Sequence, residues 1–62
     1  RYEAVHIVLV HNHPSGRVTP SDADIQSTLR IRDAGKMLGI QVSDHIIVAG
    51  DQYLSMLERG IL

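Results

Sequence analysis

Two histidines separated by one residue open the most informative segment of this 62-residue chain. His11 and His13 are followed by a turn-forming stretch and then by Ser21-x-x-Asp24, which has the pattern of a helix start. Imidazole nitrogen and carboxylate oxygen are both zinc ligands, and three such ligands leave the fourth tetrahedral position for water. We therefore predict a metal site of the catalytic kind, held by His11, His13 and Asp24.

The predicted local structure brings these ligands to one point. In an extended segment, residues i and i+2 point to the same side, so His11 and His13 can reach the same ion. Pro14 and Gly16 then turn the chain, and Asp24, in the first turn of the next helix, can reach back toward the histidines. A metal held in this way lowers the pKa of its bound water to about 7 and polarises a carbonyl group.

Each of these residues also has a simpler explanation. Two histidines near the end of a strand can share this spacing by chance and be surface or hydrogen-bonded residues. Ser21 can serve as a helix N-cap and nothing more, and Asp24 can be the third residue of a capping box. The spacing of all four residues together is what favours the metal site.

Two further histidines are left out of the predicted site. His6 is separated from His11 by five positions, so strand alternation places it on the opposite face. His45 follows Asp44 at the start of a predicted strand. The aspartate could orient this histidine for a contact behind the metal ligands, but such a pair more commonly satisfies loop backbone groups.

The elements that position these residues are predicted from the hydrophobic pattern. The first apolar run is nearly continuous, which is typical of a strand buried on both faces. A helix that crosses between two strands of one sheet implies that those strands are parallel. The fold class is therefore α/β, a small mixed sheet with a crossover helix in the order β-α-β-β. The predicted elements are a strand over residues 4–10, a helix over 22–38, and strands over 42–49 and 52–56 joined by a turn at 50–51. A terminal turn over 57–62 is expected to pack Ile61 and Leu62 on the core.

One broad side of the predicted helix is expected to face the sheet, and it carries Ile25, Thr28, Ile31, Ala34, Gly35 and Leu38. Gly35 lies within this side, where a missing side chain lets the helix approach the sheet closely. This position costs about 1 kcal/mol relative to alanine in helix propensity. Leu29 and Met37 fall outside the stripe.

The composition narrows the classes of protein and site. The chain has no cysteine, which excludes disulfides and cysteine-rich zinc modules. The formal net charge is -1, so nothing predicts the basic stripe of a nucleic-acid-binding surface. The apolar stretches are far shorter than the roughly 18 residues of a membrane helix, no signal peptide is recognised, and a cytoplasmic location is the default expectation.

The motif resembles a known metalloprotease signature. His11-x-His13-Pro14, six residues and then Ser21-x-x-Asp24 is similar to the JAMM (MPN) signature, which is usually written with seven residues in that gap. Two segments resemble the RadC family in particular: His-Asn-His-Pro-Ser-Gly at residues 11–16 and Asp-His-Ile-Ile-Val at residues 44–48. The shorter gap is typical of that family. The resemblance covers nearly the whole chain.

This resemblance implies a JAB-type, deaminase-like α/β fold with zinc held by His11, His13 and Asp24. It implies a metallopeptidase in which the metal-activated water attacks a peptide or isopeptide carbonyl of a peptide or protein substrate. The hydroxyl of Ser21 would help to stabilise the resulting oxyanion, which is a catalytic role. Residues 1–62 are then expected to be a single partial JAB/MPN domain whose N-terminal strands and helix are missing.

One catalytic group is not found in the sequence. The family uses a glutamate general base from well upstream of the histidine pair. Glu3 lies at the far end of the first strand, about 26 Å from His11 by strand rise, and Glu58 belongs to the terminal turn. Neither is a credible base, so we expect weak or no peptidase activity from residues 1–62 alone.

Two expectations concern other partners. The alternative function is a non-enzymatic module associated with DNA repair, mobile elements or anti-restriction, because the RadC name is connected with these contexts. The net charge of the chain does not support DNA binding. A partial domain is also expected to expose a sheet edge and an apolar face. Such a surface favours association with the missing N-terminal part of its own domain or a homo-oligomer.

Overall fold

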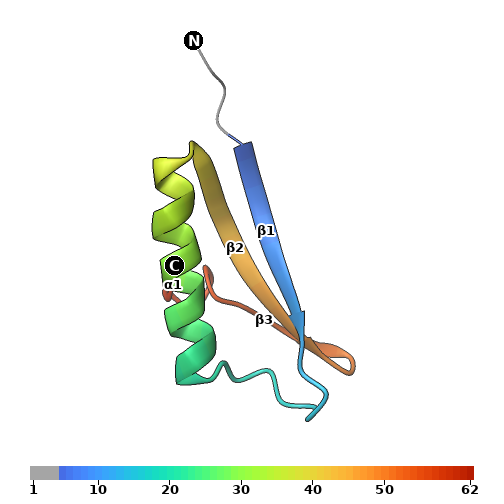
Figure 1. Cartoon of the computed structure of the whole chain (residues 1–62). Helices are drawn as coiled ribbons and strands as arrows, with labels where there is room; N and C mark the ends of the chain where they lie inside the picture. Colours follow the sequence, from blue (N-terminus) through green and yellow to red (C-terminus); the bar gives the residue numbers. More distant parts are fainter. Residues whose placement is uncertain (1–4) are drawn as a thin grey trace.

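The computed structural model describes residues 5–62 as one three-stranded mixed sheet with a single helix (Figure 1). β1 pairs with β2 in parallel, and β2 pairs with β3 antiparallel, so β2 is the central strand. The predicted α/β class, the element order and the parallel first pair are confirmed. The elements are β1 (Val5–Asn12), α1 (Asp22–Met37), β2 (Ile40–Ala49) and β3 (Gln52–Ser55).

The predicted boundaries differ from the observed ones by one or two residues. β1 continues to Asn12, beyond the predicted end, and therefore includes His11. β2 begins at Ile40, two residues earlier than predicted. Ala4, the predicted first residue of the strand, and Glu3 lie outside the described residues.

The prediction that the first strand is buried on both faces is wrong. Val8 and Val10 are 55% and 68% exposed, and they project from one face of β1. The physical reason is that α1 lies over the opposite face of the sheet, where Ile7 and Leu9 are half-buried. Helix α1 covers one face of the sheet and, among the described elements, packs against β2 alone (Figure 1).

Helix α1 begins as the sequence predicts. The hydroxyl oxygen of Ser21 accepts a hydrogen bond from the backbone N–H of Asp24 at 3.0 Å, and the Asp24 carboxylate accepts one from the backbone N–H of Ser21 at 2.9 Å. This reciprocal pair is a complete capping box. The helix ends at Met37, and Gly39 follows with φ +75°, a conformation that favours glycine.

The buried side of α1 is narrower than predicted. Thr28 and Gly35 are buried as expected, but Ile31 and Leu38 are exposed, and so is Ala34. Leu29, which falls outside the predicted stripe, is half-buried. A helix that packs on one strand buries one narrow line of residues, whereas the prediction assumed a sheet wide enough to cover a broad face.

A β-bulge in the central strand sets which of its side chains face the helix. The register pairs Ile7 with Val42 but Val8 with Asp44, so Ser43 is an extra residue in β2. A bulge shifts the inward and outward alternation of the strand that contains it. After the bulge, His45, Ile47 and Ala49 are the buried residues of β2.

The core lies where β2, β3 and the terminal turn meet. Ile47, Leu54 and Met56 form a buried cluster, and Ile61 and Leu62 pack against it. The backbone N–H of Ile61 donates to the carbonyl of Met56 at 2.9 Å, which folds the turn back. The predicted packing of this turn on the core is confirmed.

Asp44 fastens the terminal turn to the central strand. Its carboxylate accepts hydrogen bonds from the backbone N–H groups of His45 and Leu57, at 2.7 and 3.0 Å, and from the hydroxyl of Ser55. Burial raises the pKa of Asp44, but the hydrogen bonds from Ser55, Leu57 and His45 outweigh it and hold the pKa below its ordinary value. No helix within residues 5–62 has the length and apolar character needed to cross a membrane.

Replacing Gly35 by alanine should destabilise the fold. An added Cβ would lie 2.7 Å from the carbonyl oxygen of Ile40, which is backbone and cannot swing away. Overpacking of this kind costs about 1–3 kcal/mol, against about 1 kcal/mol gained in helix propensity. We expect a lower free energy of unfolding for Gly35→Ala in urea denaturation. Met37→Ala, at an exposed position of the same helix, should stay within about 0.5 kcal/mol of the wild type. An unchanged or higher stability of Gly35→Ala would contradict the close approach.

The Asp44 network should make stability depend on pH in the acid range. Because the folded pKa of Asp44 lies below the unfolded value of about 3.9, its contribution is present above that value. The contribution is lost as the pH falls through the folded pKa. Asp44→Asn should be less stable than the wild type at pH 7 by about 1–3 kcal/mol and should lose less stability below pH 4. If the free energies of unfolding of the two proteins, measured by urea denaturation, change in parallel from pH 7 to pH 3, Asp44 does not cause the acid dependence.

Candidate metal centre

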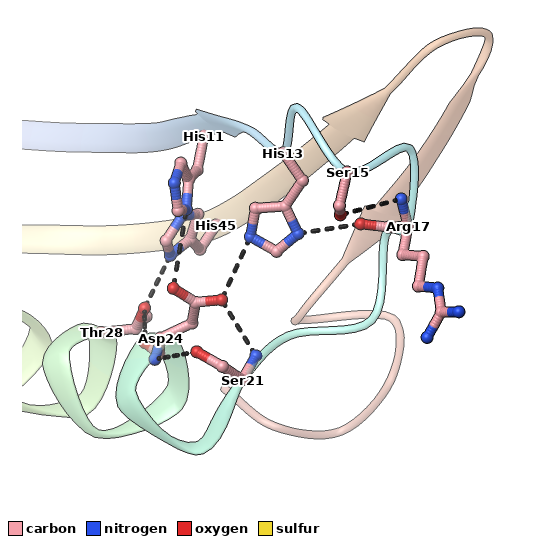
Figure 2. Close-up of polar contacts among 8 residues, drawn as sticks. All are labelled: His11, His13, Ser15, Arg17, Ser21, Asp24, Thr28 and His45. Atoms are coloured by element: carbon pink, nitrogen blue, oxygen red, sulfur yellow. Dashed lines mark hydrogen bonds and ion pairs between the residues drawn. The ribbon is translucent and has the colours of Figure 1, made fainter.

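Three potential metal ligands meet where β1 ends and α1 begins (Figure 2). His11 is the next-to-last residue of β1, and His13 follows the strand. The backbone N–H of His13 donates to the carbonyl of Val48 at 2.9 Å, so pairing with β2 continues past the end of the strand. Asp24 faces both imidazoles from the first turn of α1. One ligand atom from each of His11, His13 and Asp24 lies within 4.8 Å of the others, so the structure brings the three residues together.

The loop after β1 fixes the orientation of the second imidazole. The carbonyl oxygen of Arg17 accepts a hydrogen bond from Nδ1 of His13 at 2.9 Å. The turn is closed by Gly16, whose backbone N–H donates to the His13 carbonyl and whose φ is +83°. Because Nδ1 carries the proton, Nε2 of His13 is the atom left for a ligand. That nitrogen points at Asp24 (Figure 2).

The carboxylate of Asp24 links the two histidines to the helix cap. One oxygen lies 3.1 Å from Nε2 of His13 and also accepts from the backbone N–H of Ser21. The other oxygen lies 3.7 Å from Nδ1 of His11. The hydrogen bond from the Ser21 backbone lowers the pKa of Asp24 below its ordinary value, and the Ser21 side chain and both histidines lower it further against a partial desolvation. Asp24 is therefore held as the anion.

The geometry of His13 and Asp24 favours a proton or a cation between them. With one proton on Nδ1, a neutral His13 ring would turn the lone pair of Nε2 toward a carboxylate oxygen at 3.1 Å. Two facing lone pairs repel each other, so the contact is favourable when Nε2 is protonated or when a cation binds both atoms. A tetrahedral zinc ion with bonds of 2.0–2.1 Å separates its ligand atoms by about 3.3 Å. The 3.1 Å between Nε2 of His13 and one Asp24 oxygen is close to this separation, and one ligand atom from each of the three residues lies within 4.8 Å of the others. Two imidazoles and a carboxylate are also donor types that zinc takes, so the residues fit such an ion.

Ser21 lies beside the cluster and keeps a proton to donate. Its oxygen accepts from the backbone N–H of Asp24, which uses a lone pair and leaves the hydroxyl hydrogen available. Together with His13, Asp24 and Pro14, Ser21 lines an open groove of about 600 Å³. The predicted cap of α1 is thus also a hydroxyl donor within the groove that runs past the ligands.

The two histidines left out of the predicted site lie in different places. The side chain of His6 approaches Ser43 at 3.4 Å, and His6 does not belong to the cluster. His45 is 9% exposed and lies beside His11, with ring centroids 6.1 Å apart (Figure 2). Within the Asp44–His45 pair, Asp44 satisfies backbone N–H groups as expected. The His45 ring instead contacts Thr28 on the helix. The signal that identifies it is the bulge at Ser43, which depends on strand pairing and has no local sequence pattern.

A buried hydroxyl connects His45 to the metal cluster. Thr28 donates to the backbone carbonyl of Asp24 at 2.7 Å, and its oxygen lies 2.6 Å from Nδ1 of His45. Desolvation lowers the pKa of His45, and the neighbouring His11 and His13 lower it further, while Asp24 and Asp44 oppose these effects. Glu58 lies on the terminal turn, is exposed and does not belong to this group, and Glu3 lies outside the described residues.

Comparison with known proteins identifies one family. The family model described as RadC-like JAB domain matches residues 1–61. A UPF0758 protein from Staphylococcus haemolyticus is 54% identical over 54 residues, which are 87% of this chain and 24% of that protein. A UPF0758 protein from Geotalea uraniireducens is 52% identical over 62 residues, which are 100% of this chain and 27% of the relative. The chain thus spans about a quarter of the length of these curated relatives.

Proposed function

The chain belongs to the RadC-like JAB domain family, and we propose that it binds zinc and contributes most of a metallopeptidase site. His11, His13 and Asp24 are the ligands in this proposal, and Ser21 is the hydroxyl donor. The substrate is a peptide or protein whose peptide or isopeptide carbonyl is attacked by water.

The observation that carries this proposal is the contact between His13 and Asp24. The Arg17 carbonyl commits the His13 proton to Nδ1, and the Ser21 backbone holds the Asp24 carboxylate in place. The two groups that remain face each other across 3.1 Å with the third ligand, His11, alongside. A divalent cation satisfies all three at once, whereas a single proton satisfies one pair.

The residues of the chain then have separate tasks. When bound, the zinc ion supplies Lewis acidity and lowers the pKa of water. The side chains of His13 and Asp24 are 15% and 17% exposed and lie on the protein side of the site. The side chain of His11 is 46% exposed and lies on the solvent side. The Ser21 hydroxyl is available to donate to a substrate carbonyl oxygen that lies in the groove, where negative charge develops during the attack.

The general base is assigned to a residue outside this span. Proton removal from the attacking water needs a group within hydrogen-bond reach of it. No glutamate among residues 5–62 joins the ligand cluster, and the relatives are about four times as long as this chain. We therefore propose that a glutamate elsewhere in the longer protein completes the site, so that residues 1–62 alone bind metal better than they catalyse hydrolysis.

Zinc should stabilise the folded chain through Asp24. At a free zinc concentration 100 times the Kd, binding adds about 2.7 kcal/mol to the free energy of unfolding, which calorimetry detects as a higher Tm. Asp24→Asn should abolish most of the shift, because asparagine keeps an oxygen for the cap but loses the charge.

The matched control is Asp22→Asn, which removes a charge from the same helix turn at a position outside the ligand cluster. It should keep the zinc response of the wild type. The proposed site would be wrong if zinc did not change the Tm of the wild type, or if zinc raised the Tm of Asp24→Asn by as much as that of the wild type.

Hydrolysis should require the longer protein and Ser21. With a fluorescence-quenched peptide library as probe, the full-length protein loaded with zinc should cleave, and residues 1–62 alone should show little or no activity. Ser21→Ala in the full-length protein should lower kcat about 100- to 1,000-fold, as expected for the loss of an oxyanion donor, and should leave zinc content unchanged. Ser27→Ala, at an exposed position of α1 outside the groove, should keep the wild-type kcat. Substantial cleavage by residues 1–62 alone would overturn the assignment of the base.

A further inference from the structure

We infer that Thr28 and His45 act as a positioning pair for the metal ligands, with the ring proton of His45 fixed on Nδ1. This inference rests on the proposed function, because it concerns the same site. It assigns a task to a buried threonine and a buried histidine that neither ligate the metal nor line the groove.

The proton assignment follows from the number of hydrogens on Thr28. The Thr28 hydroxyl has one proton, and the backbone carbonyl of Asp24 can accept but never donate, so this 2.7 Å contact uses that proton. The Thr28 oxygen also lies 2.6 Å from Nδ1 of His45. Because the hydroxyl proton is already used, His45 must donate from Nδ1. The order of donation is therefore His45 to Thr28 to Asp24.

The pair contacts the ligand cluster from two sides. Thr28 holds the backbone carbonyl of Asp24, the residue that provides the carboxylate (Figure 2). His45 lies on β2 opposite Leu9, so His11 is its diagonal neighbour two residues along β1 on the same face. The rings of His45 and His11 have centroids 6.1 Å apart. A single buried pair thus connects the ligand from the helix with the ligand from the strand.

The burial of the pair makes its geometry rigid. Thr28 is 1% exposed, and no buried side-chain nitrogen or oxygen in the described part of the chain lacks a hydrogen-bond partner. Removing one partner from such a pair leaves the other buried and unsatisfied, so the intact arrangement is strongly preferred. Groups that orient metal ligands in this way typically change metal affinity 10- to 100-fold when they are mutated.

The first test is zinc affinity in Thr28→Val, measured in the full chain by competition with a chromophoric chelator. Valine keeps the shape of threonine and removes the hydroxyl. We expect zinc affinity about 10- to 100-fold weaker and an altered visible absorption spectrum of the Co²⁺-substituted protein. Thr28→Ser, which keeps the hydroxyl, should restore both the affinity and the spectrum.

The matched control is Ser55→Ala. Ser55 is also buried and its hydroxyl donates to the partly buried Asp44 carboxylate, but Ser55 does not belong to the ligand cluster. This variant should lose stability and keep wild-type zinc affinity. The comparison separates a general loss of stability from a loss of ligand positioning.

A second measurement needs no substitution. Long-range ¹H–¹⁵N NMR spectra of the wild-type protein should show His45 protonated on Nδ1 and unprotonated on Nε2. A proton on Nε2 would overturn the inference, as would unchanged zinc affinity and Co²⁺ spectrum in Thr28→Val while the wild type binds zinc. A wild type that binds no zinc would instead overturn the proposed function, and the positioning role would fail with it.

Discussion

The Asp24 carboxylate is the constraint on which the site and the start of the helix both depend. Its hydrogen bond from the Ser21 backbone is part of the capping box, so the same contact that begins α1 fixes the carboxylate near His13. A ligand held by a cap has already lost its rotamer freedom when a metal binds, which lowers the entropic cost of binding. The entropic cost is instead met on folding, because the Asp24 side chain is fixed when the capping box forms.

The position of Asp24 in turn depends on how α1 is fixed on the central strand. The two buried residues of the helix, Thr28 and Gly35, are seven positions apart, or about 10 Å along the axis. Gly35 rests on the Ile40 carbonyl at one end of β2, and Thr28 contacts His45 farther along the strand. Two contacts on one strand define the direction of a helix, so the first turn arrives at the end of β1 in a fixed place.

The sequence predicts those parts of the structure that depend on local chemistry. The His11-x-His13 spacing and the capping box are local, and the structure brings these residues together as predicted; the resemblance to the RadC family is confirmed as well. The exposed valines of β1 and the position of His45 were not predictable, because they depend on strand order and on a bulge opposite Val8. The hydrophobic pattern indicates which residues prefer burial, but strand pairing and helix packing determine which of them are buried.

The cluster lies at the boundary between the packed and the open side of the molecule, and the proposed hydrolysis would need this asymmetry. Behind the ligands, Thr28, His45 and Ile47 are buried and fully packed, so the imidazoles and the carboxylate have a rigid support. In front, the groove at His13 and Ser21 is open to solvent, and His11 is the most exposed ligand. A metal enclosed on all sides would serve structure, whereas a metal with one open side can exchange water for a substrate oxygen. The exposed side of the cluster therefore leaves room for an exchangeable fourth ligand, which an enclosed structural metal site lacks.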